Sequence, residues 1–301
     1  MRRPLELSRR RALGLAAGLA LLPRPGLAAR PTIARRVAVI DWAVLETVLA
    51  LGVEPVAATE LLQFRKVAVE PEVPVPVIDL GLRGTPNYEA LNLAEPDLIL
   101  TSNYYEGQRA SLERVAEVLS LSIYVPGVPP YPAAAEAATT LGRRLGREAQ
   151  ARAFVATAAA EIARLRDSLR GTLSRPVLAI NFGDARHVRA FGTDSMFGEV
   201  LRRLGIENAW KADSSYSAAA PVGIEALARL PDAAVIVVPP VPADALRTLA
   251  DSALWQALPM VREKRVSVIE PVNHFGGLPA ALRFARLVSA ALLQQEGGRH
   301  G

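Results

Sequence analysis

The chain has 301 residues, half of them hydrophobic and 22% charged, which is enough for two domains of ordinary size. It contains no cysteine, and this excludes disulfides, thiolate metal sites and a lipid anchor on an N-terminal cysteine. The formal net charge is +5, but residues 1–28 hold six arginines against one glutamate and so carry the whole excess. The rest of the chain is neutral in sum, so a nucleic-acid-binding surface has no support.

The N-terminus has the three parts of an export signal. Ser8 is followed by three arginines, residues 14–22 are apolar, and small residues surround Ala28 and Ala29. This order is typical of secretory signal peptides, and the apolar run is too short to span a bilayer. Because the paired arginines resemble a twin-arginine signal, we predict that residues 1–28 are a signal peptide of that type. The mature protein is then expected in the periplasm.

From residue 37 onward, short apolar strands alternate with helical segments. In the first half we predict strands at 37–40, 53–57, 98–101 and 123–125, and helices at 45–51, 87–94 and 108–119. Residues 67–77 alternate valine with proline, which favours an extended segment, and 78–84 read as a strand end and turn. Gly52 stands where a left-handed cap would close the first helix.

Two helices are predicted in the middle of the chain. Gly142 and Gly146 are expected to end a shorter helix at 132–145. Residues 147–171 carry an apolar stripe at steps of three and four residues with no proline, which predicts one long helix. A long helix between two similar halves indicates two lobes with a cleft.

After this helix the same order of elements recurs. We predict strands at 177–181, 234–238 and 266–269, and helices at 197–204, 225–230, 246–257 and 278–295. The segment 46–55 resembles 199–208, and Glu89 and Glu225 follow at corresponding places.

The alternation predicts an α/β fold with parallel sheets. We expect two Rossmann-like lobes, at residues 33–145 and 175–296, joined by the single long helix at 147–171.

Ligands in open α/β sheets bind beyond the carboxyl ends of the strands. This rule points to Trp42, Arg83, Tyr104, Tyr105, Asn181 and the loop 273–275. Arg83, between two glycines, could bind anionic oxygens in bidentate fashion or pair with a nearby acid. Tyr104 and Tyr105 would point to opposite faces of an extended segment, so that one could line the cleft while the other packs in the core.

Glu89 and Glu225 occupy matching positions, one in each half. A carboxylate on each lobe could dock on a partner that carries paired arginines. Alternatively, both are first-turn glutamates favoured by a helix dipole.

Metal and enzyme sites find little support. His187 and His274 are far apart in the sequence, so no multi-histidine metal cage is expected. No nucleophile elbow, phosphate loop or dinucleotide fingerprint occurs. Asp184, His187 and Ser195 could form a hydrolytic triad on paper, but such residues occur in any chain of this length.

Several stretches match a known family. They are Ser8 to Arg11, Asp41-Trp42 before Glu46, Leu49 to Gly52, Val77 to Arg83, Pro86-Asn87, Phe191-Gly192, Asn208 to Trp210, Leu254 to Pro259 and Val261-Arg262. Over nearly its whole length the chain resembles the periplasmic substrate-binding proteins for iron–siderophore complexes, especially those for ferric hydroxamates of the ferrichrome type.

The resemblance implies two lobes on one rigid helix (the class III, helical-backbone type) that open little when ligand binds. It implies that Arg83 and Tyr105 contact the iron-bound hydroxamate oxygens, and that Glu89 and Glu225 dock on the permease dimer of an ABC importer. Iron stays inside the siderophore, so no metal ligand or cofactor of the protein's own is expected. We expect a monomer without enzymatic activity.

The cleft departs from the family on its C-terminal side. The family's aromatic residues are replaced by the stretches 214–217 and 273–276, and a tryptophan expected near Val67 is absent. A different hydroxamate, or a mixed hydroxamate–carboxylate siderophore, therefore fits as well as ferrichrome. The candidate ligand-binding residues are Arg83, Tyr105, Trp42, Tyr104, Tyr216, His274 and Phe275.

Two alternative functions stay open at this point. A cobalamin or haem carrier of the same fold would co-purify with a coloured ligand. An exported α/β esterase would lose its turnover of esters with Ser195→Ala.

Overall fold

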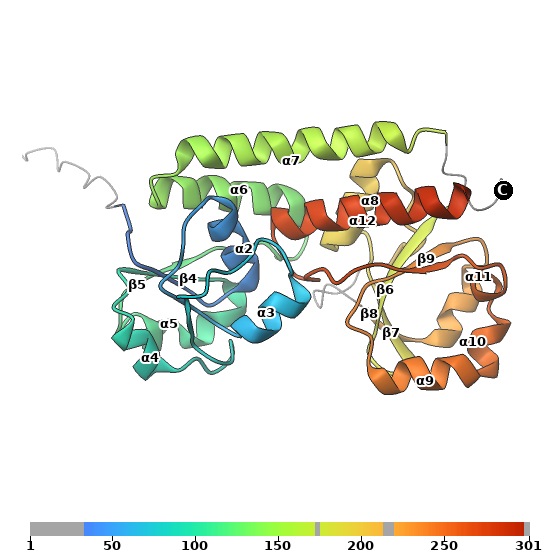
Figure 1. The fold of residues 1–301 in the computed structure, drawn as a ribbon, viewed down its shortest axis with the longest axis horizontal. Helices are drawn as coiled ribbons and strands as arrows, with labels where there is room; N and C mark the ends of the chain where they lie inside the picture. The colour runs from blue at the N-terminus through green and yellow to red at the C-terminus, as the bar shows by residue number, and fades with distance from the viewer. Residues whose placement is uncertain (1–32, 172–174, 213–219, 298–301) are drawn as a thin grey trace, which may run out of the picture. The chain divides into compact units, whose positions relative to one another are not determined.

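The computed structural model describes residues 33–171, 175–212 and 220–297 (Figure 1). Residues 33–301 form one structural unit. The predicted signal peptide at 1–28 and the candidate residue Tyr216 lie outside the described residues. Within the described ranges, no helix combines the length and the apolar character that crossing a membrane requires.

The first half forms a five-stranded sheet in the order β3-β2-β1-β4-β5, and all neighbouring strands are parallel. Its strands are β1 (Val37–Val39), β2 (Ala57–Ala58), β3 (Ile78–Asp79), β4 (Leu98–Thr101) and β5 (Glu117–Ser120). Its helices are α2 (Trp42–Ala50), α3 (Leu61–Val67), α4 (Tyr88–Leu93), the 3₁₀ helix η2 (Asn103–Gln108) and α5 (Arg109–Leu112). The central strand β1 is buried on both faces, as its continuous apolar run predicts.

The second half forms another five-stranded sheet in the order β10-β9-β6-β7-β8. Its strands are β6 (Val177–Phe182), β7 (His187–Ala190), β8 (Ala220–Gly223), β9 (Ala234–Val237) and β10 (Val266–Val268). Its helices are α8 (Met196–Leu204), the 3₁₀ helix η3 (Ile224–Arg229), α9 (Ala243–Asp251), α10 (Ala253–Ala257) and α11 (Pro259–Arg262).

The prediction of parallel strands is wrong for one strand of the second sheet, β7, which was itself not predicted. β7 runs antiparallel to both β6 and β8. Between β6 and β7 the Asp184 Oδ1 accepts hydrogen bonds from the backbone N–H groups of Arg186 and His187, at 2.7 and 2.8 Å. This side-chain turn reverses the chain within a few residues, so no crossover helix is needed.

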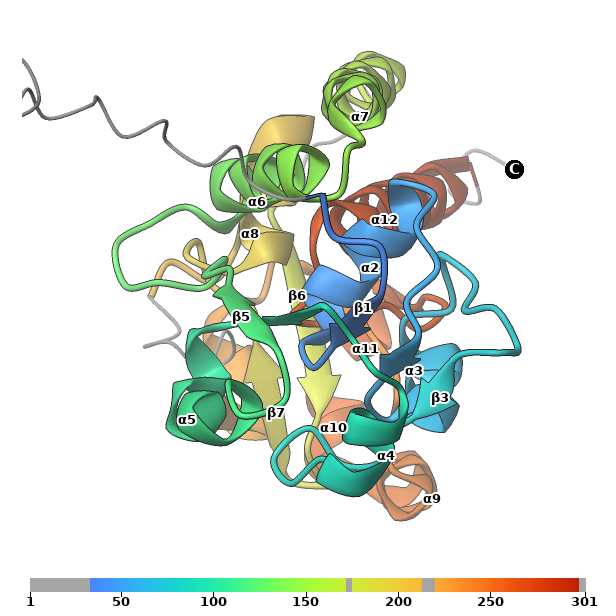
Figure 2. The ribbon, with the colours of Figure 1, turned by 90° about the vertical axis from the view of Figure 1, so that its left-hand side faces the viewer.

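Three long helices connect the halves: α6 (Pro130–Arg144), α7 (Glu148–Ser168) and α12 (Leu278–Gly297). The predicted linking helix is confirmed as α7, which packs on α6, α8 and α12; it is the outermost of these helices (Figure 2). The helix α12 returns from the second half to pack against α2 of the first. Both halves therefore share one apolar cluster, to which Val48, Ile162, Phe197 and Phe284 belong.

The two glycines before α7 have different roles. Gly146 has a φ of 63° and lies in the turn between α6 and α7, as expected. Gly142 does not end α6, contrary to the prediction. A Cβ at this position would lie 2.5 Å from the Cβ of Ala151, so the glycine lets α6 and α7 pack closely.

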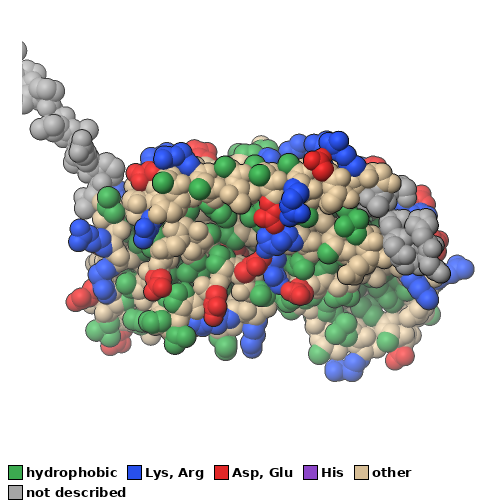
Figure 3. All heavy atoms as spheres, turned by 45° about the horizontal axis from the view of Figure 1, so that its top comes forward, with side chains coloured by type: hydrophobic (Ala, Val, Ile, Leu, Met, Phe, Trp, Pro, Cys, Tyr) green, Lys and Arg blue, Asp and Glu red, His purple; other side chains and the backbone are tan. Residues whose placement is uncertain are grey.

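Charged side chains on the face of α7 and α12 also link the halves. Figure 3 shows basic and acidic groups side by side near the middle of this face. Arg286 of α12 pairs with Glu161 of α7 at 3.1 Å and with Glu70, which follows α3. Arg283 pairs with Glu270 at 2.7 Å. Glu70 and Arg286 are about 40% exposed, so each such pair contributes about 0–1 kcal/mol.

Several predicted elements differ from the observed ones. The helix at 108–119 ends at Leu112, and the strand predicted at 123–125 is instead β5, because Glu117–Ser120 pairs with β4. Sheet pairing here outweighs local helical preference. The helix at 246–257 is two helices, since Ser252 is extended and caps α10. The helix α3 was not predicted; it ends where the valine–proline alternation begins.

Candidate ligand-binding site

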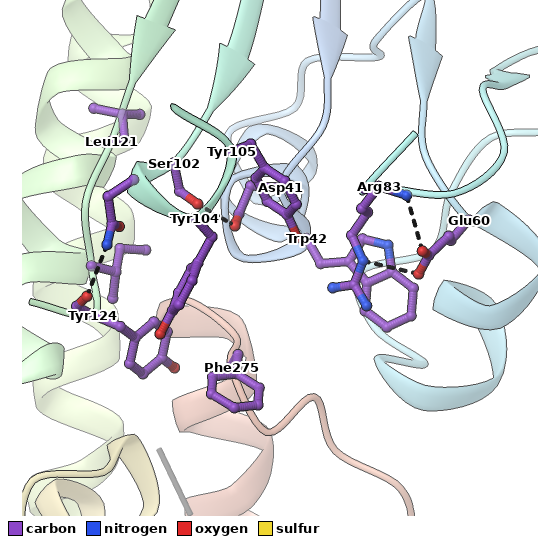
Figure 4. A pocket seen from close by; sticks show the side chains of 13 residues that line it. Asp41, Trp42, Glu60, Arg83, Ser102, Tyr104, Tyr105, Leu121, Tyr124 and Phe275 are labelled. Carbon is purple, nitrogen blue, oxygen red and sulfur yellow. Dashed lines mark hydrogen bonds and ion pairs between the residues drawn. The ribbon is translucent and has the colours of Figure 1, made fainter. Parts of the chain in front are cut away.

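A cavity of about 460 Å³ lies at the carboxyl ends of the first sheet's strands (Figure 4). The segments that follow all five strands of this sheet contribute to its wall, and one residue comes from the second half. The lining residues are Asp41, Trp42, Glu60, Arg83, Gly84, Ser102, Asn103, Tyr104, Tyr105, Leu121, Ile123, Tyr124 and Phe275. The position agrees with the rule that parallel sheets bind ligands beyond the carboxyl ends of their strands.

Arg83 is held by an acid and by an aromatic face. Its Nε donates to Glu60 Oε2 at 2.9 Å, and its backbone N–H donates to Glu60 Oε1 at 3.0 Å. Its guanidinium carbon lies 4.0 Å from the centre of the Trp42 ring, within the range of a cation–π contact. Trp42 is fixed in turn, because its Nε1 donates to the Thr59 carbonyl at 3.1 Å. Arg83 therefore pairs with an acid and also lines the cavity.

Tyr105 lies beside a buried carboxyl group. Burial, aided by the charge of Asp41, raises the pKa of Tyr105 to about 12, and Arg83 opposes this shift. Tyr105 therefore keeps its phenolic proton at neutral pH and can donate it to a ligand oxygen.

Asp41 joins β1, β4 and α2 at the wall of the cavity. It caps α2, accepting from the backbone N–H groups of Ala43 and Val44 at 2.8 and 3.1 Å, and it accepts from Ser102 Oγ at 2.8 Å. Burial raises the pKa of Asp41, while these hydrogen bonds and Arg83 lower it. Sequence reasoning missed five polar wall residues: Asp41, Glu60, Ser102, Asn103 and Tyr124. An aspartate between an apolar strand and a helix was the available signal for the first.

Tyr104 and Tyr105 both line the cavity, which corrects the expectation of opposite faces. They lie in the 3₁₀ helix η2, not in an extended segment, and Tyr105 has φ −114° and ψ 15°. Tyr104 packs edge-on to Phe275 at 6.4 Å between ring centres, and Tyr124 does so at 5.7 Å (Figure 4). These rings form the aromatic part of the wall. The hydroxyl of Tyr124 donates to the Gly276 carbonyl at 2.7 Å.

His274 does not line this cavity, although it was predicted to. Its Nε2 lies 3.2 Å from the Pro239 carbonyl oxygen, and its ring packs against Phe191 and Phe197 at 5.3 and 6.1 Å between centres. Burial lowers the pKa of His274 to about 4, so the ring is neutral. Asn181 is also structural, since its amide donates to two backbone carbonyls of the loop after β9.

A fully buried glutamate joins the two halves near the cavity. Glu46 of α2 accepts from Asn273 Nδ2 at 2.7 Å and from the backbone N–H of Gly277 at 2.9 Å. Burial raises its pKa to about 8. Phe275, the second half's contribution to the wall, lies between these two contacts, so Glu46 helps to place it.

The fold agrees with the comparisons with known proteins. The sequence profile of the family described as periplasmic binding protein matches residues 37–272. This chain belongs to the periplasmic binding protein family. Among curated relatives, the iron(3+)-hydroxamate-binding protein FhuD of Escherichia coli K12 is 29% identical over 257 residues, 85% of this chain and 86% of FhuD.

Solved structures agree with the assignment to the periplasmic binding proteins. The siderophore-binding protein FhuD of Vibrio cholerae, crystallised with Fe³⁺–Desferal, is 29% identical and has a TM-score of 0.83; the match covers 87% of this chain and 98% of that one. The triscatecholate siderophore-binding protein FeuA of Bacillus subtilis, at 19% identity, covers 88% of this chain and 93% of its own, with a TM-score of 0.70. The FeuA match supports the fold only.

Three other residues that the sequence analysis singled out, Glu89, Glu225 and Ser195, are not among the lining residues of the cavity. Glu89 and Glu225 are exposed, in the first turns of α4 and η3. Ser195 is fully buried, donates to the Gly192 carbonyl at 2.7 Å and caps α8, so its hydroxyl is occupied in structure. Over the described ranges, no group of three or more histidine or acidic side chains is arranged to hold a metal ion. Its relatives are binding proteins, which points away from an enzyme.

Proposed function

We propose that this periplasmic binding protein captures a ferric siderophore of the hydroxamate type in the cavity and delivers it to an ABC importer. The observation that carries the proposal is the pairing of Arg83 with Tyr105 in one cavity beyond the strand ends. Both groups donate hydrogen bonds, and the iron-bound oxygens of a hydroxamate carry partial negative charge. The relatives named for iron(3+)-hydroxamate and for Fe³⁺–Desferal support the same ligand class.

Each part of the wall has a distinct task in this proposal. Arg83 binds the oxygens around iron with its terminal nitrogens, and Tyr105 donates its phenolic proton. Trp42, Tyr104 and Phe275 contact the apolar chain of the siderophore. Iron remains inside its chelator as cargo, and the protein supplies no iron ligand of its own.

Delivery requires a second surface. We propose that Glu89 and Glu225, one on each lobe, dock on basic side chains of the permease dimer, and that the protein acts as a monomer in the periplasm. The lobes are taken as residues 33–145 and 175–296. Export through the predicted signal at 1–28 and a ligand contact from Tyr216 stay predictions, because both lie outside the described residues.

The proposal is tested by titrating the mature protein with ferrichrome and with ferrioxamine B while tryptophan fluorescence is recorded. We expect saturable quenching, which Trp42→Phe reduces because Trp42 lies in the wall. Arg83→Ala should weaken binding by about 1–3 kcal/mol, the usual cost of losing a charged hydrogen bond. If the folded wild type showed no quenching with any ferric hydroxamate and no binding by calorimetry, the proposal would be wrong.

The same experiment separates the alternative carriers. Cobalamin and haem are included in the titration, and tighter binding of either would replace the siderophore in the proposal. A histidine-ligated haem has little support, because none of the described residues lining the cavity is a histidine and His274 packs against phenylalanine rings.

A further inference from the structure

Glu60 is a wall residue to which neither the sequence nor the proposed function gives a role. It immediately precedes α3 and has a φ of 50°, in the left-handed region that non-glycine residues seldom adopt. Both of its carboxylate oxygens accept hydrogen bonds from Arg83, one from the backbone and one from Nε. The contact joins the segment after β2 to the segment after β3.

This contact fixes the direction of the arginine. Glu60 engages the Nε edge of the guanidinium, and the Trp42 ring covers one of its faces at 4.0 Å. The Arg83 carbonyl accepts from Gln108 Nε2 at 3.1 Å, which holds the backbone as well. On the cavity side, the Arg83 side chain also forms a hydrogen bond with Tyr105. An arginine ordered before the ligand arrives loses less side-chain entropy on binding.

Glu60 also sets the sign of the charge in the cavity. Among the described residues that line the cavity, Arg83 is the one basic residue, and Asp41 and Glu60 are the two acidic ones. The wall carries one net negative charge when both carboxyls are ionised. It is neutral when Asp41 holds a proton, which burial favours. In neither case is it positive. The Glu60 and Arg83 side chains are 19% and 30% exposed, so solvent screens them only in part.

Ferric chelates differ in charge by their chemistry. Three singly charged hydroxamates around Fe³⁺ leave a neutral complex, and a free amine on the chain makes it cationic. Three doubly charged catecholates leave a trianion, and carboxylate-bearing chelators also leave anions. A net negative wall repels these anions, and a neutral wall offers them no net attraction to offset the cost of removing them from water.

We propose that Glu60 is a positioning and specificity-determining residue: it orients Arg83 and makes the site select neutral or cationic ferric trihydroxamates over anionic ferric chelates. This inference rests on the proposed function and narrows it, since it excludes the mixed hydroxamate–carboxylate siderophores that the sequence left open.

The test compares wild type, Glu60→Gln and Glu60→Ala by calorimetry. The probes are ferrichrome (neutral), ferrioxamine B (cationic) and a ferric triscatecholate (anionic). Wild type should bind the first two and discriminate against the third. Glu60→Gln removes the charge but keeps the shape and one acceptor oxygen. Its affinity for ferrichrome should stay within about threefold of that of the wild type. Its affinity for ferrioxamine B should fall by about fivefold, and its affinity for the triscatecholate should rise by a similar factor.

Glu60→Ala separates positioning from charge. It also releases Arg83, so ferrichrome affinity should fall by about tenfold, and the glutamine variant should recover most of that loss. The differences between charged probes should shrink at high salt. Circular dichroism and Tm establish that each variant folds.

The outcomes distinguish the two proposals. If wild type binds no ferric chelate, the proposed function itself fails. If wild type binds ferrichrome but Glu60→Gln leaves the order of the three probes unchanged, or wild type prefers the anion, the role of Glu60 is overturned while the carrier function stands.

Discussion

The two sheets have the same spatial order of strands, but one of the five strands differs in direction. The order β3-β2-β1-β4-β5 in the first half corresponds to β8-β7-β6-β9-β10 in the second. β2 and β3 run parallel to β1, whereas β7 runs antiparallel to its neighbours. A parallel strand needs a crossover connection and an antiparallel strand needs only a hairpin, so the two halves carry different segments at the strand ends.

This difference explains why the wall of the cavity comes almost wholly from the first half. The segments around β2, α3 and β3 bring Glu60 and Arg83 together beside Trp42. At the corresponding edge of the second sheet, a hairpin places Asp184 and His187 on the surface. A repeat in sequence therefore does not imply a repeat of the site.

A second pair of glutamates at corresponding positions of the repeat, Glu46 and Glu199, also differs between the two halves. Glu46 of α2 and Glu199 of α8 are both buried. Glu46 accepts hydrogen bonds from the other half, through Asn273 and Gly277. Glu199 instead pairs with Arg202 and Arg203 of its own helix, at 2.8 and 3.1 Å.

The largest effect is expected one residue before these glutamates. A Cβ on Gly198 would lie 2.0 Å from the Gly192 carbonyl oxygen, which is backbone and cannot move aside cheaply. Gly198→Ala should lower the free energy of unfolding by about 3 kcal/mol or more. The corresponding Leu45 is fully buried, and Leu45→Ala should cost about 2–5 kcal/mol through a cavity instead.

Urea unfolding of both variants measures these losses. Gly107→Ala is the matched control, since a Cβ there meets nothing within 4 Å and the change should stay within about 0.5 kcal/mol. A Gly198→Ala protein as stable as that control would contradict the close approach.

Glu46→Ala should cost more than Glu199→Ala. The first change leaves two buried donors of the other half without an acceptor, at about 1–3 kcal/mol each. The second removes pairs whose Arg202 side chain is 68% exposed, which contribute about 0–1 kcal/mol each. Chemical unfolding gives both values, and equal losses would argue against Glu46 as a tie between the halves.

The stability of the protein should fall as the pH rises toward 8. The folded state raises the pKa of Glu46 from 4.5 to about 8, so its contribution is complete below pH 4.5 and is lost between 4.5 and 8. His274 acts in the opposite direction, because its pKa falls from 6.5 to about 4 and its contribution is lost as the pH falls through that range. Above pH 6.5 the contribution of His274 is complete, so the loss caused by Glu46 is no longer opposed by this histidine.

Between pH 6.5 and 8, the free energy of unfolding should fall by at most about 1.4 kcal/mol per pH unit. Glu46→Gln should flatten this pH dependence of the free energy of unfolding. Denaturant unfolding at a series of pH values measures the slope; a wild-type curve that rises from pH 6.5 to 8 would refute the assignment.

The smallest effect is expected at the matched surface glutamates. For Glu89→Gln and for Glu225→Gln, the concentration of binding protein that half-stimulates the importer's ATPase should rise by about fivefold. This rise corresponds to a loss of roughly 1 kcal/mol in docking free energy. The double variant should lose about the sum if the two lobes dock independently. Affinity for ferrichrome, measured in parallel, separates a docking defect from a folding defect. If only one of the two variants weakened stimulation of the ATPase, the two lobes would not dock on the importer symmetrically.

The sequence by itself determined the alternation of strands and helices, the two halves and the helix between them. It also predicted Arg83, Tyr104, Tyr105 and Phe275, which all line one cavity. Apolar periodicity and the strand-end rule are local properties of the chain, which is why they could place these residues beyond the strands; their contact with a ligand stays a prediction. Gly205, with φ 77°, closes α8 in the left-handed cap that its repeat partner Gly52 also provides.

Only the tertiary structure decided which polar groups face one another. Glu60 lies 23 positions from Arg83 along the chain, and Glu46 lies 227 from Asn273, so no local pattern could pair them. His274 was placed in the wall because it follows a strand, but its ring packs against two phenylalanine rings and does not line the cavity. Burial and hydrogen bonds between distant residues depend on how the two sheets and their helices pack. That packing involves the whole chain, so no single stretch of sequence determines it.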